Sequence, residues 1–545
     1  MLHRHVLSVL LLVLALLAAA GCGKKETTGP GSDGGASSGK KILRYGNGAE
    51  PSELDPQTVT GIPEHHIIMS LFEGLVTEDP VDLHPVPGMA EKWEISADGL
   101  TYTFHLRAGL KWSNGEPLTA SDIEASFRRM LTPALASEYS YLLWFVTGAE
   151  DYNRGKLADW SQVGFKSPDD RTLVVTLGSP TPFLLQMIAS HYSWWPVPVR
   201  EIAKYGPVDR KGVPWTRAGR LVGNGAFRLK EWTPNQRIVV ERNPHYWDAA
   251  AVKLDEVEFH PTENLQAEEA MFRTGRLDRT QELPVGKIDT YRKEFPESLR
   301  IEPWLGVYFY RFNCTRPPFT DKRVRRALAL AIDRESIVEN VTRGGQIPAY
   351  GVSYPGTAGY VPTAKLEGSL AEAKRLLAEA GFPDGKGFPR VELQYNTQDN
   401  HRIIAEAIQQ MWRQNLGIEV GLVNQEWKVY LDSQDTLSFD IQRGGWIADY
   451  VDPHVFLEIF TSWNLNNDTG WGSDEYDRLF RQALVAKTDA GRYAIYQKMD
   501  ALLVDECPVM PLYHYTRVYA LSPKVKGWHP TLLDNHPFKA LNLER

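Results

Sequence analysis

Residues 443–450 read RGGWIADY, a stretch in which two opposite charges flank a large aromatic ring. Arg443 stands three residues before Trp446, and Asp449 stands three residues after it. An arginine binds carboxylates well, an aspartate binds ammonium groups, and a tryptophan offers a broad apolar face. The stretch could therefore hold one zwitterionic ligand, because its two glycines let a ligand or another backbone come close. It could also be an ordinary ion pair packed under an aromatic ring.

The chain carries no convincing sequence motif of a common enzyme or metal site: Gly35-Ala36-Ser37-Ser38-Gly39 fits G-x-S-x-G, but no strand is predicted before it and no helix after it. It contains neither G-x-x-x-x-G-K-[ST] nor H-E-x-x-H, and Gly223-Asn224-Gly225 lacks the rest of a dinucleotide-binding motif. His65, His66 and the scattered carboxylates are expected as surface groups rather than as ligands. No catalytic residue, metal or cofactor is predicted, and a binding function is favoured over an enzyme.

The overall charge argues against one class of partner. The 545 residues include 60 Lys and Arg against 68 Asp and Glu, which gives a net charge of -8 at pH 7. No long basic run interrupts this balance, so a nucleic-acid-binding surface is not indicated. The length suits several domains and a large buried core.

The N-terminus carries an export signal. MLHRH supplies positive charge, the apolar run Val6–Ala20 follows, and Ala19-Ala20-Gly21-Cys22 resembles a bacterial lipobox, with Ala19 where Leu is usual. We expect residues 1–21 to be a lipoprotein signal peptide and Cys22 to be lipidated. Residues 22–41, rich in Gly and Ser, are then a flexible tether. This predicts a protein in the periplasm or at the cell surface, anchored to the membrane by Cys22.

The other two cysteines carry no recognisable motif. Cys314 and Cys507 lie far apart without C-x-x-C spacing, so neither a metal ribbon nor a redox pair is indicated. Whether they form a disulfide stays open from the sequence.

Strand and helix patterns alternate along the rest of the chain. TYTFHL, residues 101–106, alternates as one strand of a hairpin. Residues 390–424 read as strand, helix and strand, the helix being apolar at Ile404, Ile408, Met411 and Trp412. Ser369 starts a further helix as the first residue of a capping box. Together these patterns predict a large mixed α/β protein.

Many blocks of the chain, from Leu43 to Arg545, carry a family resemblance. They are GAEPSELDPQ at 48, LFEGLVTED at 71, HPVPGMAEKWE at 84, FHLRAGLKWSNGEPLTASD at 104, GNGAFRLKEW at 223, ERNPHYWD at 241, DKRVRRALALAIDRE at 321, IPAYG at 347, LAEAGFP at 377, VNQEWK at 423 and RGGWIADY at 443. Over this length the chain resembles the extracytoplasmic solute-binding proteins of peptide ABC transporters, and most closely their oligopeptide-binding branch.

The resemblance implies an α/β, two-lobed periplasmic-binding-protein-like fold of type II with an extra inserted domain. The first lobe would comprise residues 42–74, 199–300 and 517–545, the inserted domain residues 75–198, and the second lobe residues 301–516. A hinge near residues 307–313 and 509–515 would let the lobes close around a ligand.

It also implies roles for individual residues. Asp449 would bind the α-ammonium of a peptide, and Arg443 and His401 would neutralise its carboxylate. Trp446 and Trp427 would wall side-chain pockets. The remaining expected peptide contacts are Tyr139 from the inserted domain, Gly445, Ile447 through its backbone, Ile62 and Gln434.

Three cleft positions depart from the family. Thr60, Thr342 and Gln434 stand where close relatives carry Glu, Lys and Arg, and Arg343 is a candidate replacement for the lysine. The departures affect the carboxylate end of the site, and thus the preferred peptide length and charge.

By this resemblance the protein is a monomeric, lipid-anchored receptor that delivers oligopeptides to the permease subunits of an ABC transporter. Alternatives within the same fold are receptors for a murein peptide, a dipeptide, a nickel chelate or an oligosaccharide. A lipoprotein hydrolase or a surface scaffold are alternatives from other classes. Peptide length, affinity and the number of membranes around the cell stay open.

Overall fold

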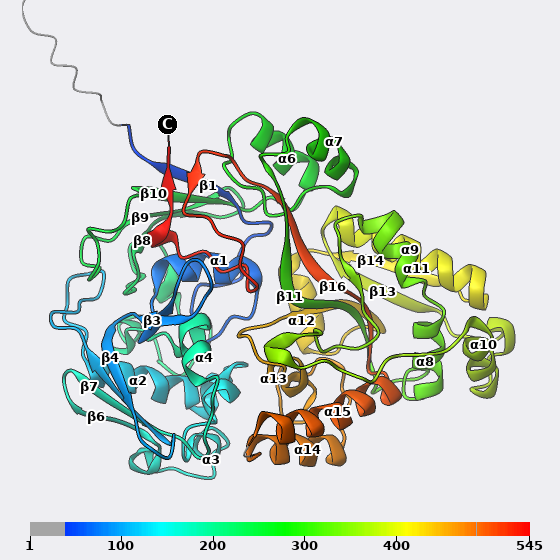
Figure 1. Cartoon of the computed structure of the whole chain (residues 1–545), viewed down its shortest axis with the longest axis horizontal. Coiled ribbons are helices and arrows are strands. Elements are labelled where there is room, and N and C mark those ends of the chain that lie inside the picture. The colour runs from blue at the N-terminus through cyan, green and yellow to red at the C-terminus, as the bar shows by residue number, and fades with distance from the viewer. Residues whose placement is uncertain (1–38, 487, 545) are drawn as a thin grey trace, which may run out of the picture. The chain divides into compact units, whose positions relative to one another are not determined.

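Three β-sheets of four or six strands organise the computed structural model of the protein, which describes residues 39–486 and 488–544 (Figure 1). The predicted signal peptide, Cys22 and all but the end of the predicted tether lie outside these residues. Within the described residues, no helix is both long and apolar enough to cross a membrane.

The first sheet has the strand order β1-β10-β9-β8 and mixes parallel and antiparallel pairing. Leu43 and Tyr45 alternate toward the core and are fully buried, as expected for a strand with one buried face. The elements of this region are β1 (Ile42–Gly46), β8 (Phe227–Thr233), β9 (Arg237–Arg242), β10 (Glu256–His260), α1 (Ile62–Leu71), α6 (Leu265–Arg273), α7 (Ile288–Glu294), β17 (Val525–Lys526) and β18 (Asn542–Leu543).

The second sheet is antiparallel, with the order β4-β5-β7-β6, and it confirms the hairpin predicted at residues 101–106. Tyr102, Phe104 and Leu106 of β5 are buried, while the residues between them are partly exposed. The elements are β2 (Val76–Glu78), β3 (Pro85–Pro87), β4 (Ala90–Ile95), β5 (Thr101–Leu106), α2 (Ala120–Leu131), α3 (Ala149–Asn153), β6 (Phe165–Asp169), β7 (Thr172–Thr176), α4 (Leu184–Ser190), the 3₁₀ helix η4 (Tyr192–Trp194) and α5 (Val199–Ile202).

The third sheet has the order β12-β16-β11-β15-β13-β14. Its strands are β11 (Leu299–Phe312), β12 (Ile347–Pro348), β13 (Val391–Asn396), β14 (Val420–Gln425), β15 (Ile441–Ile447) and β16 (Val509–Ala520). The helices of the same region are α8 (Lys322–Leu330), α9 (Arg334–Ser336), α10 (Leu370–Glu379), α11 (Asp399–Leu416), α12 (Trp427–Asp435), α13 (His454–Leu457), α14 (Asp474–Leu484) and α15 (Asp489–Glu506).

Two predictions for this region are confirmed. β13, α11 and β14 form the expected crossover with parallel strands, and Ile404, Ile408 and Trp412 are buried on one face of α11. The Ser369 side chain accepts the backbone N–H of Glu372 at 3.2 Å and caps the start of α10, which confirms the helix start. Of the predicted capping box, the described residues show this bond and not its reciprocal from Ser369 N–H to the Glu372 side chain.

Strands β11 and β16, of 14 and 12 residues, extend from the third sheet toward the first sheet. They pair with each other from Leu299 to Arg311 of β11, and the ladder is irregular between Pro303 and Phe309. Beyond the end of β16, Leu521 bridges to Arg279, which also bridges to Tyr45 of the first sheet. The predicted hinge segments lie within these two strands.

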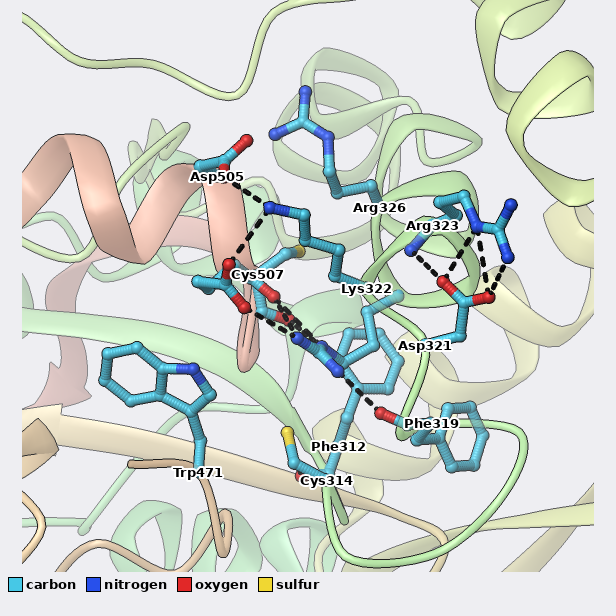
Figure 2. Close-up of polar contacts among 12 residues, drawn as sticks. Phe312, Cys314, Phe319, Asp321, Lys322, Arg323, Arg326, Trp471, Asp505 and Cys507 are labelled. Atoms are coloured by element: carbon cyan, nitrogen blue, oxygen red, sulfur yellow. Dashed lines mark hydrogen bonds and ion pairs between the residues drawn. The ribbon is translucent and has the colours of Figure 1, made fainter. Parts of the chain in front are cut away.

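Where α8 meets α15, basic side chains of α8 donate hydrogen bonds to acceptors at the C-terminal end of α15 (Figure 2). Lys322 Nζ donates to Asp505 Oδ2 at 2.7 Å, and the buried Arg325 guanidinium donates to the carbonyl oxygens of Glu506 and Cys507. These carbonyls lie at the C-terminus of α15, where no further helical turn supplies donors. The cations of α8 therefore fix the end of α15.

The two cysteines of this region are not bonded to each other. Cys314 and Cys507 are both free thiols, which answers the question that the sequence left open. Burial raises the pKa of each thiol to about 11, so both are protonated at neutral pH.

Candidate functional site

A cavity of about 290 Å³ opens among residues of all three parts of the fold. All ten residues predicted to contact a peptide line it, although they come from distant parts of the chain. They are Ile62, Tyr139, His401, Trp427, Gln434, Arg443, Gly445, Trp446, Ile447 and Asp449.

Arg443 lies in β15 and is a partly buried cation without a carboxylate partner among the described residues. Its Nη2 donates to Tyr515 Oη at 2.7 Å, its guanidinium carbon lies 4.7 Å from the centre of the Tyr308 ring, and its Nε has no partner. Burial alone would lower the pKa of Arg443, but Tyr515 and Tyr308 raise it above its ordinary value. Keeping the Arg443 charge partly buried is costly unless an anion pairs with it. The geometry therefore suits a ligand carboxylate.

Asp449 follows the end of β15 and is a partly buried acid at the cavity wall, without a cationic partner among the described residues. Its Oδ1 lies 3.3 Å from His191 Nε2, and its Oδ2 is buried without a partner among the described residues. Burial, with a smaller effect of Glu458, raises the pKa of Asp449 well above its ordinary value. Within the described residues no ion pair joins Asp449 to Arg443, so the alternative of an internal ion pair between them is wrong.

Packing of neighbouring side chains requires both glycines of the stretch to be small. A Cβ on Gly444 would lie 2.5 Å from the Phe309 ring, and one on Gly445 would lie 2.7 Å from Tyr515 Oη. These positions are thus small because side chains of β11 and β16 pack against them.

One edge of β15 is open toward the cavity. β15 pairs with β11 along its length, but with β13 only at Ile441 and Gln442. Hydrogen bonds from Ala448 N to Leu305 O and from Asn313 N to Asp440 O show that the even-numbered residues of β15 direct their backbone N–H and C=O groups toward β11. The backbone groups of Gly445 and Ile447 therefore point away from β11, toward the side where no described strand pairs. An extended peptide could add to this edge.

His401 lies in the first turn of α11 and is neutral in this structure. It is buried, with Nδ1 3.4 Å from Tyr308 Oη. Burial and the nearby Arg443 hold the pKa of His401 well below its usual range. It would approach a carboxylate as a neutral hydrogen-bond donor, whereas the sequence suggested a charge-neutralising role.

Three aromatic residues shape the walls of the cavity. Trp427 begins α12 and stacks on Tyr430 with ring centres 5.5 Å apart. Trp446 of β15 lies 6.4 Å from Tyr139, which is itself buried. Of the remaining predicted residues, Ile62 begins α1 and Gln434 lies near the end of α12.

Other lining residues were missed by the sequence reasoning or placed wrongly. His65 is partly exposed at the cavity and bonds Asn535 Oδ1 through Nε2 at 2.8 Å. His66 is buried, so the expected surface placement is wrong for His66. Thr60 lines the cavity as well. Arg343 is not among the lining residues and instead pairs with Asp289, so it does not replace a cleft lysine.

Two further cations at the cavity were not singled out in the sequence. Arg311 pairs with Asp468 at 2.7 Å, and Arg517 pairs with Asp534 at 2.7 Å. Their partners lie 157 and 17 residues away respectively. Because both are already paired, they leave Arg443 as the better candidate for a ligand anion.

Comparison with known proteins places the chain in a family. Residues 84–468 match the family described as bacterial extracellular solute-binding proteins, family 5. The periplasmic oligopeptide-binding protein OppA of Escherichia coli is 38% identical over 498 residues, which cover 90% of each chain. The structure of Haemophilus influenzae OppA in complex with RPPGFSPFR is 33% identical, with a TM-score of 0.87 and coverage of 93% of this chain and 99% of that one.

A third comparison concerns conformation. The unliganded open form of the murein tripeptide-binding protein MppA is 34% identical and covers 92% of this chain and 97% of its own, yet its TM-score is only 0.61. At nearly equal identity, the present structure thus resembles the peptide complex more than the open form. The chain belongs to the family 5 bacterial extracellular solute-binding proteins, which have a two-lobed periplasmic-binding-protein fold and are transport receptors rather than enzymes.

Proposed function

We propose that this protein is a lipid-anchored receptor outside the cytoplasm that binds oligopeptides in the described cavity and delivers them to an ABC transporter. The open edge of β15 carries the proposal, because the cation of Arg443 and the acid of Asp449, both partly buried and without an ion-pair partner among the described residues, lie at its two ends. Similarity to proteins named for binding oligopeptides supports it.

This arrangement suits a receptor that tolerates many sequences. Every peptide has an ammonium, a carboxylate and a backbone, whereas its side chains vary. Backbone pairing to Gly445 and Ile447 would give affinity without reading side chains. Asp449 would take the ammonium, and Arg443 with His401 would take the carboxylate of a short peptide. Trp427, Trp446 and Tyr139 would line the space for side chains.

Other solutes fit the cavity less well. A neutral oligosaccharide would cover Arg443 and Asp449 without giving either a charged partner, which is costly for each charge. A nickel chelate would satisfy neither the open backbone edge nor the ammonium side of the site.

The domain assignment is part of the proposal. The first lobe comprises residues 42–74, 199–300 and 517–545, the inserted domain residues 75–198, and the second lobe residues 301–516. We propose that the lobes close on the ligand by bending in β11 and β16, and that the protein acts as a monomer.

Identification of ligand carried through purification tests the function. The purified protein is denatured, and the released small molecules are analysed by mass spectrometry beside a matched Asp449→Asn preparation. We expect peptides of varied sequence from the native protein and far less from the variant. Release of a sugar or a metal chelate, with no peptide, would contradict the proposal.

A further inference from the structure

A contact between distant parts of the chain completes the surroundings of Asp449. Ser190, the last residue of α4, donates its hydroxyl to the carbonyl oxygen of Asp449 at 2.5 Å, although 259 positions separate the two residues. The next residue, His191, places Nε2 at 3.3 Å from Asp449 Oδ1. These two residues lie beyond the second sheet in sequence, whereas Asp449 follows β15 of the third.

The proton on His191 can be assigned from its other contacts. The backbone N–H of Ser193 donates to His191 Nδ1 at 3.2 Å, which makes Nδ1 an acceptor without a proton. Burial holds the pKa of His191 well below its usual range, so the ring is neutral. A neutral imidazole carries one proton, and it therefore sits on Nε2, the nitrogen that faces Asp449.

The imidazole is also held in place. His191 is 2% exposed, and its ring lies 4.3 Å from the ring of Tyr139 and 4.3 Å from that of Tyr192. A ring packed between two aromatic side chains has little freedom to turn away. The donor on Nε2 is thus fixed beside Asp449.

We infer that His191 is a positioning residue for recognition of the peptide ammonium, an inference that rests on the proposed function. Its Nε2 lies 3.3 Å from Oδ1 of Asp449 but makes no hydrogen bond with the described residues, so its N–H acts on that oxygen as a nearby dipole. Oδ2, which is buried and likewise without a partner among the described residues, is left for the ligand. A neutral donor orients the carboxylate without cancelling its charge, whereas a lysine or arginine would cancel it. Since His191 and Asp449 belong to different proposed domains, the ammonium site is complete only when the α4–η4 segment packs against the end of β15.

Two substitutions at one position test the inference. His191→Phe keeps a ring between Tyr139 and Tyr192 but removes the donor, and His191→Gln is the matched control because its amide can donate from a similar place. Dissociation constants are measured calorimetrically for trialanine and for N-acetyl-trialanine, with weak binding measured by competition. We expect His191→Phe to weaken trialanine binding about tenfold. Binding of the acetylated peptide should stay unchanged, and His191→Gln should lie within about threefold of the native protein.

An equal loss for both peptides would make His191 merely structural, and no loss for trialanine would remove it from the site. Thermal unfolding checks the fold, and His191→Met, which also lacks a donor, replaces His191→Phe if the latter does not fold. Failure of the native protein to bind either peptide would contradict the proposed function itself, and this inference with it.

Discussion

Replacement of Asp449 by asparagine should abolish useful peptide binding while leaving the protein as stable as before. Asp449 is partly buried, its Oδ2 atom fully so, and no cation lies within 4.0 Å of it among the described residues, since the nearby His191 is neutral. Removing its charge therefore breaks no internal ion pair, and it relieves a buried charge. We expect an unfolding temperature that is unchanged or higher.

The loss of affinity follows from the ligand. A peptide ammonium brought into this site without a carboxylate would be a buried, unpaired charge, which costs roughly 2 to 5 kcal/mol. At about 1.4 kcal/mol per decade, the dissociation constant should rise about thirty-fold to several thousand-fold. Calorimetric titration with trialanine measures the rise directly.

Proton release on peptide binding gives a second measure of the effect of Asp449→Asn. Because the pKa of Asp449 is raised in the protein without ligand, the group holds a proton over part of the pH range in which a peptide ammonium is charged. Binding of the ammonium lowers this pKa, so a proton leaves, and affinity should rise as pH rises toward the pKa of the ammonium, about 8. Titrations in buffers of different ionisation enthalpy should show this release in the native protein and not in Asp449→Asn. A destabilised variant that still binds trialanine with native affinity would refute the reasoning.

The remaining predictions concern the carboxylate, closure and the anchor. Arg443→Met should weaken binding of trialanine by a similar thirty-fold or more but should hardly change binding of trialanine amide, and equal losses would contradict the assignment. Trialanine should reduce the radius of gyration measured by small-angle scattering, because the ligand favours the closed lobes, and an identical curve at saturation would contradict closure. Cys22→Ser should move the protein from the membrane fraction to the soluble fraction of cells, and an unchanged distribution would remove Cys22 as the anchor.

The local elements could be predicted because their patterns are local. Ile404, Ile408 and Trp412 recur at helical spacing, which indicates a helix from the local sequence alone. Residues 101–106 alternate between apolar and polar because one face of β5 is buried. The ten predicted contact residues, all of which line the cavity, were identified through a family resemblance. Nothing in their spacing brings Ile62 or Tyr139 next to β15.

The contacts that fix the chemistry of the site could not be predicted from the sequence. The approach of His191 to Asp449 depends on how α4 packs against the end of β15, and no sequence period encodes that packing. The protonation of His401 depends on burial and on Arg443, which lies 42 positions away. The packing that requires the glycines of the opening stretch could not be predicted, because the side chains involved, Phe309 and Tyr515, come from other strands.

Binding of one peptide with its ends free or blocked tests the central claim most directly. The claim is that the cavity recognises a peptide by its two charged ends and its backbone. Titration of the native protein should show tight binding of trialanine, a loss of about thirty-fold or more on N-acetylation or on C-amidation, and little change when the central alanine becomes leucine or serine. Equal affinity for trialanine and for N-acetyl-trialanine amide would contradict the claim.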